Sequence, residues 1–452
     1  MNKQIFIDKG KLITKEVPKS TCRQGEVIVD VLYSAFSSGT EFGEIIKSSK
    51  SLLERARQSP EKIGKALEMV KTTGLKNTIN FVQDSQLALT ATGYSAAGVV
   101  SSVGKGINDL AVGDMVACAG AQYAHHASQV KVSKQLCAKL PYGLSPSLAS
   151  TVTLGSIAMQ GLRQAEISLG EKVAVIGLGV IGQITCQLLL AAGTNVTGLD
   201  LDEKKLLLAS ECGVQNTLNV KNNDFLERGL ELTDGHGYDK VLICASDTSS
   251  SSVKTAFELA RHRATVVMIG GIGLDLDRKL MYYKELNFVA SMSYGQGRYE
   301  RDYEEKGLDL PIAYVRWTEN RNMLSYLEVI NNRQKNFENL IGNIIDFNEA
   351  EKYLNSDKSK NLEKPLIIIK YSKLEETSQI NPDPSKRRVT VDKNISNVGL
   401  VGAGGFAKNF ILPNINLVKN ANISVLASSD TASLVNMKDK YNIQRCVSNI
   451  DE

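Results

Sequence analysis

The stretch Val173-Ala-Val-Ile-Gly177-Leu-Gly179-Val-Ile-Gly182 decides the fold of this chain. Its apolar first half predicts a buried strand, its GxGxxG spacing predicts a tight turn, and residues 183–192 continue as a helix. In such a turn Gly177 permits the sharp bend, Gly179 lets backbone N–H groups approach a pyrophosphate, and Gly182 lets the helix pack closely. The helix N-terminus then directs its partial positive charge at the phosphates. The pattern predicts a dinucleotide site, and a glycine-rich turn without a ligand is the alternative.

A second strand supports the dinucleotide interpretation. Residues 195–200, Asn-Val-Thr-Gly-Leu-Asp, end in an acid about 20 residues after the glycines, where a ribose 2′-hydroxyl needs an acceptor. A 2′-phosphate would meet the Asp200 carboxylate with no arginine beside it, so the sequence favours NAD over NADP.

Further cofactor contacts follow from the expected fold. The loop after the strand at 240–245 is expected to border the adenosine, and Gly270 and Gly271 are expected to let backbone approach the nicotinamide. Lys205 is either a ribose ligand or a solvated helix charge. The residues expected at the cofactor are Gly177, Gly179, Val180, Ile181, Gly182, Asp200, Lys205, Ala245, Gly270 and Gly271.

Composition narrows the class of protein. The 452 residues are 42% hydrophobic, and 53 basic against 49 acidic side chains give a net charge of +4. The charges are mixed along the chain, which argues against nucleic-acid binding. Seven scattered cysteines without a CxxC pair suit reduced thiols, and no apolar run is long enough for a membrane span. The sequence predicts a cytoplasmic protein.

Hydrophobic periodicity divides the chain. Residues 1–150 carry short β-like runs, interrupted by a helical stretch between Ser48 and Asn80. From 151 to 293 strands alternate with helices, as in a doubly wound parallel sheet of the α/β class. The strands expected there cover residues 172–176, 195–200, 216–220, 240–245, 264–269 and 287–291.

The last part of the chain holds a second nucleotide-binding pattern. An apolar strand at 365–371 is expected to rejoin the first domain, and the polar segment 373–396 predicts an exposed linker. Residues 397–407 again form strand, GxGxxA turn and helix start, and a strand expected at 421–430 ends in Asp430. The remaining residues to 452 are too few for a whole domain, which predicts an incomplete Rossmann unit.

Three stretches carry a resemblance to the medium-chain dehydrogenase/reductases, whose first domain is GroES-like. They are Ala35-Phe-Ser-Ser38-Gly39-Thr40-Glu41, Gly93-Tyr94-Ser95-Ala-Ala-Gly98, and Gly113-Asp114-Met-Val116. Compared with the zinc alcohol dehydrogenases of that family, Ser38 replaces a zinc-ligand cysteine, and Tyr94 and Ser95 replace a His-Glu pair. Zinc prefers thiolate and imidazole ligands, so we expect no zinc and no other metal. His125 and His126 are expected to be structural, since the sequence shows them without Cys or acid partners.

The chain more closely resembles bacterial bi-domain oxidoreductases, in which a zinc-less medium-chain dehydrogenase is fused to a domain of the glucose-fructose oxidoreductase and inositol dehydrogenase (Gfo/Idh/MocA) type. The stretches that carry this are Leu154-Gly-Ser-Ile-Ala-Met-Gln-Gly-Leu-Arg163, Tyr294-Gly-Gln-Gly-Arg298-Tyr299 and Tyr314-Val-Arg316-Trp317-Thr-Glu319-Asn-Arg321. The resemblance implies a sugar or nucleotide-sugar substrate, a role in surface polysaccharide biosynthesis, and dimerisation through nucleotide-binding domains. It also implies a GroES-like domain at 1–150 completed by 294–372, an NAD-binding domain at 151–293, a linker at 373–396, and a truncated Gfo/Idh/MocA-like unit at 397–452.

The resemblance also implies candidates for the chemistry. Hydride transfer requires a group that takes up the hydroxyl proton, and without a metal this falls to hydrogen-bonding side chains. By position Thr40 matches a proton-relaying hydroxyl, Glu41 matches the acid beside it, and Tyr94 faces the substrate. A satisfied turn for Thr40 and Glu41, and simple packing for Tyr94, are the alternatives.

Arginine and aromatic side chains gather between residues 298 and 321. Arginine forks suit a diphosphate and aromatic faces suit a base or sugar. The candidates for a nucleotide-sugar pocket are Arg298, Tyr299, Arg316, Trp317 and Arg321, and a structural arm packed on the Rossmann domain is the alternative. For the whole chain, the sequence favours an NAD-dependent oxidoreductase. The alternatives are an NAD-binding sensor or assembly protein without turnover, and an inactive truncated fragment.

Overall fold

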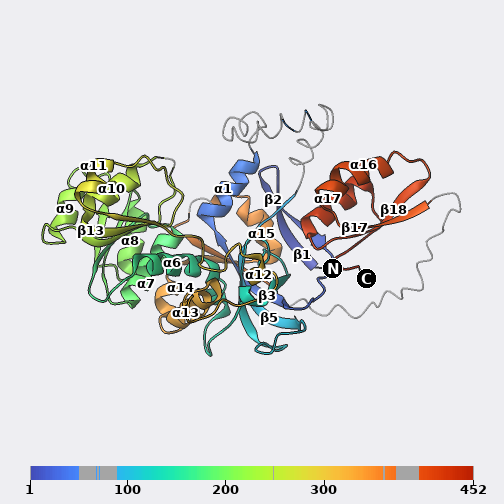
Figure 1. Ribbon diagram of the computed structural model, residues 1–452, viewed down its shortest axis with the longest axis horizontal. Coiled ribbons are helices and arrows are strands. Elements are labelled where there is room, and N and C mark those ends of the chain that lie inside the picture. Colours follow the sequence, from blue (N-terminus) through green and yellow to red (C-terminus); the bar gives the residue numbers. More distant parts are fainter. Residues whose placement is uncertain are drawn as a thin grey trace.

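The structure is a computed structural model that describes residues 2–49, 68, 71, 89–247, 249–359, 362–372 and 396–450. Most of the helical stretch expected between Ser48 and Asn80, and nearly all of the linker expected at 373–396, lie outside these residues. Within the described residues the elements form four sheets; in Figure 1 the sheet of residues 172–290 lies at one end of the long axis, the sheet of residues 396–447 at the other, and the remaining two between them.

The central nucleotide-binding part is a six-stranded parallel sheet with the strand order β11-β10-β9-β12-β13-β14, the order of the doubly wound dinucleotide fold. Its strands are β9 (Lys172–Ile176), β10 (Asn195–Asp200), β11 (Asn216–Asn219), β12 (Tyr238–Ile243), β13 (Ala260–Met268) and β14 (Asn287–Ala290). The helices around it are α6 (Val152–Ala165), α7 (Val180–Ala191), α8 (Glu203–Glu211), α9 (Phe225–Glu231), α10 (Ser251–Leu259) and α11 (Arg278–Tyr283). Val173, Ala174 and Val175 are fully buried, because helices cover both faces of the sheet.

The expected strands of this sheet are all present. β9 and β10 have their expected bounds, β11 and β14 end one residue early, and β12 and β13 are shifted further. β12 ends at Ile243 rather than Ala245, and β13 begins at Ala260 rather than Ala264. A register shift between Tyr238 and Lys240 accommodates the longer β13. The backbone after Ile243 leaves the sheet toward the cleft described below.

The first part of the chain forms a seven-stranded sheet with the path β15-β16-β3-β5-β6-β8, and β7 pairs with β3. Its strands are β3 (Glu26–Ser37), β5 (Ser95–Val103), β6 (Met115–Ala119), β7 (Gln129–Ser133), β8 (Cys137–Lys139), β15 (Ile341–Asp346) and β16 (Leu366–Lys370). Its helices are α1 (Ser38–Ser49), α5 (Pro146–Ala149), α12 (Arg301–Glu304), α13 (Glu319–Asn331), α14 (Gln334–Glu338) and α15 (Phe347–Leu354), with 3-10 turns η1 (Lys134–Leu136) and η2 (Asp357–Ser359). The expected return of the chain is observed, since β16 pairs antiparallel with β3. Ile367, Ile368 and Ile369 of β16 are fully buried there.

The C-terminal residues fold as a small separate unit. Its parallel sheet has the order β17-β18-β19. The elements are β17 (Ser396–Val401), β18 (Ala421–Ala427), β19 (Arg445–Val447), the π-helical turn η3 (Ala407–Ile411), α16 (Leu412–Ile415) and α17 (Thr431–Tyr441). Asp430 does not end the second strand as expected. It lies three residues beyond β18 and caps α17, where its side chain accepts a hydrogen bond from the Ser433 N–H.

This C-terminal unit packs on the N-terminal hairpin. A three-stranded antiparallel sheet joins β1 (Asn2–Asp8), β2 (Lys11–Val17) and β4 (Thr90–Ala91). Val435 of α17 packs with the buried Phe6 and Val17, and Asn436 Oδ1 accepts a hydrogen bond of 2.9 Å from the Leu89 N–H. The unit therefore lies against the N-terminal hairpin, where Figure 1 shows α17 beside β1 and β2, and it contacts Leu89 and Ala91 just before the loop at residues 92–94.

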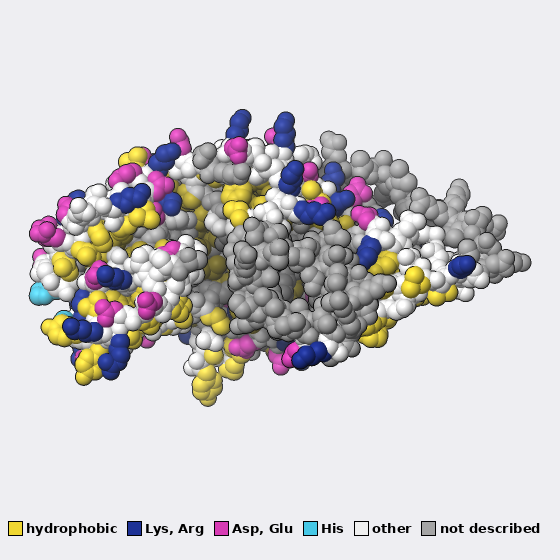
Figure 2. All heavy atoms as spheres, turned by 90° about the horizontal axis from the view of Figure 1, so that it is seen from above, with side chains coloured by type: hydrophobic (Ala, Val, Ile, Leu, Met, Phe, Trp, Pro, Cys, Tyr) yellow, Lys and Arg dark blue, Asp and Glu magenta, His cyan; other side chains and the backbone are white. Residues whose placement is uncertain are grey.

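The described surface carries charges of both signs. Figure 2 shows basic and acidic side chains side by side on the face that it presents. Among the described residues no helix has both the length and the apolar character that a bilayer crossing requires. All seven cysteines are free thiols.

Candidate active site

A cleft of about 1260 Å³ lies between the parallel sheet and the first domain. The glycine turn and the ends of β10, β12 and β13 form one wall, and α1, Tyr94 and α6 contribute to the other. The sequence-predicted residues that line it are Tyr94, Gly177, Gly179, Val180, Ile181, Asp200, Lys205, Ala245, Gly270 and Gly271. The cleft thus brings Tyr94, a predicted catalytic residue, together with the predicted cofactor residues.

The glycines of this cleft have separate physical roles. Gly177 has a φ of +92°, which an L side chain rarely adopts. A Cβ added at Gly182 would lie 1.9 Å from the Gly177 carbonyl oxygen, and one at Gly270 would lie 1.8 Å from the Ala245 carbonyl oxygen. At Gly179 an added Cβ would meet nothing within 4 Å. Gly182 and Gly270 therefore serve close packing, whereas Gly179 leaves open space where a ligand can approach.

Asp200 lies at the end of β10, with 8% of its surface exposed. Its Oδ2 accepts a hydrogen bond of 2.7 Å from the Leu178 N–H of the glycine turn, and its Oδ1 accepts one of 3.0 Å from the Asp202 N–H. Lys205 Nζ lies 3.5 Å from Asp200 Oδ1, so this lysine is paired with the acid. Both carboxylate oxygens are thus fixed by backbone N–H groups, and Lys204 and Lys205 line the same cleft.

Tyr94 lies on the opposite wall, where hydrogen bonds fix its backbone. Its carbonyl oxygen accepts from Thr153 Oγ1 at 2.7 Å and from the Gly120 N–H at 3.0 Å. Thr40 belongs to α1, but its side chain, like that of Ser38, lies outside the described residues. The sequence does not predict α1, because Ser38, Gly39 and Gly43 are poor helix formers.

Glu44 of α1 also lines the cleft, and the sequence interpretation missed it. Desolvation, together with the nearby Glu41 carboxylate, raises the pKa of Glu44 above its ordinary value. The signal in the sequence was weak, since one acid on an unpredicted helix carries no motif.

Glu41 does not reach the cleft. It is buried, with 1% exposed, and its Oε1 lies 2.8 Å from His126 Nε2. The prediction that the histidines have no acid partner is therefore wrong for His126. The error arises because the partner lies 85 positions away in the sequence, and the fold brings the two together.

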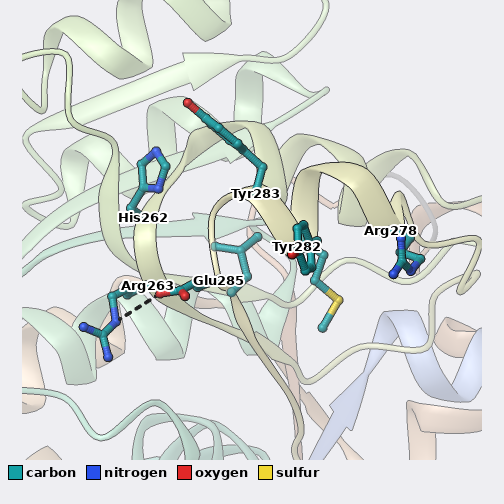
Figure 3. A pocket seen from close by; sticks show the side chains of 8 residues that line it. His262, Arg263, Arg278, Tyr282, Tyr283 and Glu285 are labelled. Carbon is teal, nitrogen blue, oxygen red and sulfur yellow. Dashed lines mark ion pairs between the residues drawn. The ribbon is translucent and has the colours of Figure 1, made fainter.

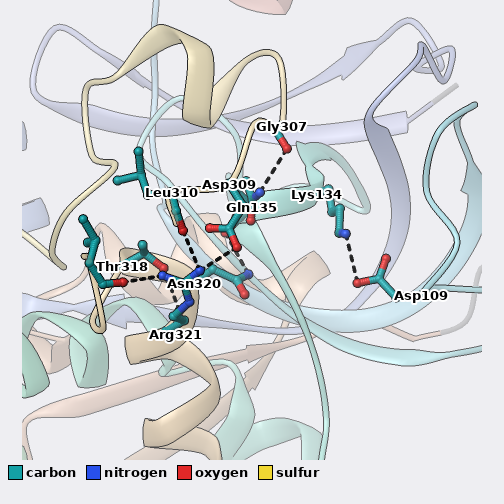
Figure 4. A network of polar contacts seen from close by, with 10 residues as sticks. Asp109, Lys134, Gln135, Gly307, Asp309, Leu310, Thr318, Asn320 and Arg321 are labelled. Carbon is teal, nitrogen blue, oxygen red and sulfur yellow. Dashed lines mark hydrogen bonds and ion pairs between the residues drawn. The ribbon is translucent and has the colours of Figure 1, made fainter. Parts of the chain in front are cut away.

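The arginine and aromatic segment does not form the predicted diphosphate pocket. Arg321 donates to the Val315 carbonyl at 2.6 Å, to Asp309 Oδ2 at 2.6 Å and to the Leu310 carbonyl at 2.8 Å (Figure 4). Arg298 is buried and pairs with Glu304. Their guanidinium groups are occupied by the protein itself, so the structural-arm alternative describes these two residues.

The other three candidates of that segment, Tyr299, Arg316 and Trp317, also contact neighbouring side chains or solvent rather than the cleft. Trp317 lies between Arg163 and Arg316, whose Cζ atoms are 3.4 and 3.8 Å from its ring centroid. Tyr299 is 69% exposed, and Arg298 Cζ lies 4.1 Å from its ring centroid. None of the five predicted substrate residues is among those that line the cleft.

Two of the three positions that the resemblance equates with zinc ligands, Tyr94 and Ser95, carry oxygen side chains, and the third, Ser38, lies outside the described side chains. Ser95 Oγ donates to the Ser150 carbonyl at 2.6 Å and accepts from the Thr153 N–H at 3.0 Å, so it is engaged in packing. Tyr94 supplies a phenol rather than an imidazole or a thiolate. Over the part of the chain that the structure describes, no three His, Cys, Asp or Glu side chains gather as a metal site. Residues 51–88, most of which lie outside it, contain neither histidine nor cysteine.

A second hollow of about 780 Å³ lies at the outer edge of the parallel sheet, between β13 and α11 (Figure 3). Arg263 pairs with Glu285 at 3.6 Å there, and Tyr282 and Tyr283 are 76% and 70% exposed. It shares no lining residue with the cleft, and none of the predicted site residues belongs to it.

Comparisons with known proteins agree with this architecture. Residues 180–309 match the family model described as zinc-binding dehydrogenase. A probable D-xylulose reductase A of Arthroderma otae is 26% identical over 248 residues, which are 48% of this chain and 69% of that protein. An alcohol dehydrogenase of Moraxella is 24% identical over 209 residues, and the match covers 39% of this chain and 60% of that protein.

A longer relative and two solved structures complete the comparison. A mycocerosic acid synthase-like polyketide synthase of Mycobacterium tuberculosis is 31% identical over 193 residues, which are 42% of this chain but only 9% of that protein. Galactitol-1-phosphate dehydrogenase of Escherichia coli has a TM-score of 0.62 at 17% identity, covering 81% of this chain and 99% of its own. The 2R,3R-butanediol dehydrogenase of Bacillus subtilis has a TM-score of 0.59 at 15% identity, covering 82% of this chain and 99% of its own.

The fold, the glycine-turn cleft and these matches agree on the architecture. The chain has the α/β fold of its medium-chain dehydrogenase/reductase neighbours, with a GroES-like and a Rossmann part. Its neighbours include dehydrogenases of polyols and simple alcohols.

Proposed function

We propose that this chain is an NAD-dependent, zinc-independent oxidoreductase that transfers hydride between a nicotinamide and a hydroxyl or carbonyl group of a sugar or nucleotide sugar. One observation carries the proposal: Tyr94 and the Gly177–Gly182 turn with Asp200 line the same cleft. The names of the D-xylulose reductase relative and the galactitol-1-phosphate dehydrogenase neighbour support a sugar-like substrate. A role in surface polysaccharide biosynthesis rests on the resemblance to bi-domain oxidoreductases.

The residues of the cleft fit a nicotinamide dinucleotide. The open space at Gly179 and the N-terminus of α7 suit the pyrophosphate, and the Asp200 carboxylate suits a ribose 2′-hydroxyl. Ala245, Gly270 and Gly271 border the remaining length of the cleft. When bound, the cofactor supplies the hydride acceptor or donor. A 2′-phosphate would meet the Asp200 carboxylate even though Lys205 Nζ lies 3.5 Å from it, so we propose NAD as the main cofactor and NADP as the weaker one.

Tyr94 is the proposed acid/base group. Its phenol replaces the metal ligand of relatives, and hydrogen bonding from an oxygen side chain takes the place of polarisation by a cation. Thr40 is proposed to assist on the same wall. The nucleotide-sugar substrate is not assigned to the arginine segment, because Arg298 and Arg321 are engaged inside the protein.

Tyr94→Phe is expected to lower kcat at least a hundredfold, the typical contribution of general acid/base catalysis, which is about 10² to 10⁴. The phenyl ring keeps the packing, so NADH affinity is expected to change less than about twofold. Nicotinamide absorbance at steady state and NADH fluorescence titration measure the two quantities. Equal kcat values for the variant and the wild type would remove Tyr94 from the mechanism.

The experiment that tests the proposed function is a nicotinamide absorbance assay against a panel of UDP- and GDP-sugars and free polyols. A chelator is present in one arm and absent in the other. The proposal expects turnover with at least one sugar in both arms. Activity that is lost with chelator and restored by zinc alone would replace the zinc-independent mechanism.

The domain roles are part of the same proposal. Residues 1–150 with 294–372 are proposed as the GroES-like substrate domain, 151–293 as the NAD-binding domain, and 397–452 as a Gfo/Idh/MocA-like Rossmann unit after a linker at 373–396. The free thiols suit a cytoplasmic location. A homo-oligomer is proposed through the nucleotide-binding domains, where β14 is the edge strand of the sheet.

A further inference from the structure

A buried polar network lies behind the wall of the cleft that carries Tyr94. It joins Glu41, His126, Ser34 and Tyr371, whose exposed fractions are 1%, 0%, 0% and 5%. Glu41 Oε1 lies 2.8 Å from His126 Nε2, His126 Nδ1 lies 2.8 Å from Ser34 Oγ, and Ser34 Oγ lies 2.9 Å from Tyr371 Oη. The ring of Phe36 stacks on the His126 imidazole at 5.8 Å. The network connects α1, β3, β16 and the loop before β7.

Two further hydrogen bonds tie Glu41 to the cleft wall. Its Oε2 accepts from the Ser37 N–H at 2.8 Å, and its Oε1 accepts from Thr92 Oγ1 at 2.8 Å. Ser37 lines the cleft at the junction of β3 and α1, and Thr92 lies two residues before Tyr94. The backbone N–H of His126 donates to the Thr92 carbonyl at 2.9 Å, which gives the loop at residues 92–94 a second anchor. One carboxylate therefore fixes both backbone segments that present residues to the cleft.

The chemistry of this arrangement requires a carboxylate. Glu41 Oε2 accepts from the Ser37 N–H, and Oε1 accepts from the Thr92 hydroxyl and lies 2.8 Å from the His126 imidazole, so both oxygens of the carboxyl group are engaged. A glutamine would turn an NH₂ group toward one of these donors and leave a buried contact unmade. Neither Glu41 nor His126 lines the cleft, so neither touches the reacting atoms.

We propose that Glu41 and His126 are positioning residues, which hold the Ser37 and Thr92–Tyr94 segments at the separation that hydride transfer requires. The inference rests on the proposed function, in which Tyr94 acts on the substrate. A displacement of about 1 Å at a reacting group can cost about a hundredfold in rate, so a change behind the wall is felt in kcat. The cofactor turn at Gly177–Gly182 lies on the other wall and does not depend on the network.

The first test separates positioning from stability. Glu41→Gln is expected to lower kcat at least tenfold, where kcat is calculated from the concentration of NADH-binding sites. The NADH dissociation constant is expected to stay within about twofold of the wild type. Tyr371→Phe is the matched control, because it removes a hydroxyl at the far end of the same network and leaves the Glu41 contacts in place. It is expected to change kcat less than about threefold. An equal loss in both variants, or no loss in Glu41→Gln, would overturn the proposal.

The second test does not require a known substrate or a folded variant. The chain has only four histidines, His125, His126, His236 and His262, so imidazole ¹⁵N resonances of the wild-type protein can be assigned. NADH is expected to shift the His126 signals, because the nicotinamide would lie against the wall that the network holds. ADP-ribose, which lacks the nicotinamide, is expected to leave them unchanged, and His236 and His262 serve as surface references. Unshifted His126 signals at saturating NADH would contradict the coupling, whereas shifted signals without turnover of any sugar would count against the proposed function alone.

Discussion

Replacing Gly182 with alanine is expected to lower NADH affinity about a hundredfold, which corresponds to about 2.8 kcal/mol. The added methyl group would lie 1.9 Å from the Gly177 carbonyl oxygen, so the turn between β9 and α7 must open. Opening this turn moves the backbone N–H groups away from the pyrophosphate. Overpacking of this kind also costs about 1 to 3 kcal/mol of stability, so the melting temperature is expected to fall by several degrees. Fluorescence titration and calorimetry measure the two effects.

Gly179→Ala is the matched control for that change. Its methyl group meets nothing within 4 Å in the protein, so the melting temperature is expected to stay within about one degree. NADH affinity is still expected to fall at least tenfold, because the methyl group enters the space that the pyrophosphate needs. Wild-type affinity in Gly179→Ala would show that no ligand approaches this turn.

The second large effect concerns the buried acid Glu319, which lies at the start of α13. Its side chain is fully buried, and among the described residues neither carboxylate oxygen has a hydrogen-bond partner. Desolvation, reinforced by the nearby Glu304 carboxylate, raises the pKa of Glu319 from 4.5 to about 9. The folded protein therefore keeps this proton over a pH range in which the unfolded chain has lost it.

This shift predicts a pH-dependent stability. Between the unfolded pKa of 4.5 and the folded pKa of about 9, the folded state binds more protons, so the free energy of unfolding falls as pH rises. The slope from this single group is up to about 1.4 kcal/mol per pH unit. Glu319→Gln removes the titration, so the variant is expected to lose less stability than the wild type between about pH 5 and about pH 8.5. Urea unfolding at several pH values measures both slopes, and parallel slopes would refute the assignment.

The nucleotide-binding half of the fold could be predicted from the sequence, because its signals are local. Apolar runs of five or six residues, a glycine turn and an acid at the end of the next strand each depend on neighbouring positions only. The structure accordingly has a strand at each of the six predicted places and brings Asp200 to the turn. The sequence predicted that the apolar strand at 365–371 rejoins the first domain, but not that β3 is its partner, since no local signal tells a strand which distant segment it pairs with.

The errors concern residues whose partners are distant in the sequence. Arg298, Arg321 and Trp317 have the composition of a ligand site, but whether an arginine faces a ligand or a carbonyl depends on the path of the loop around it. The pairing of Glu41 with His126 is likewise invisible without the fold. Asp430 shows the reverse case, in which an acid after a strand caps the next helix instead of facing a ribose.

We propose that the cleft holds NAD against the Gly177–Gly182 turn and Asp200. A fluorescence titration of the wild-type protein with NADH and with NADPH measures this binding. Saturable binding of one NADH per chain is expected, with NADPH at least about tenfold weaker because its 2′-phosphate meets the Asp200 carboxylate. If neither nucleotide binds saturably, or if NADPH binds more tightly than NADH, the assignment of the cleft to NAD is wrong.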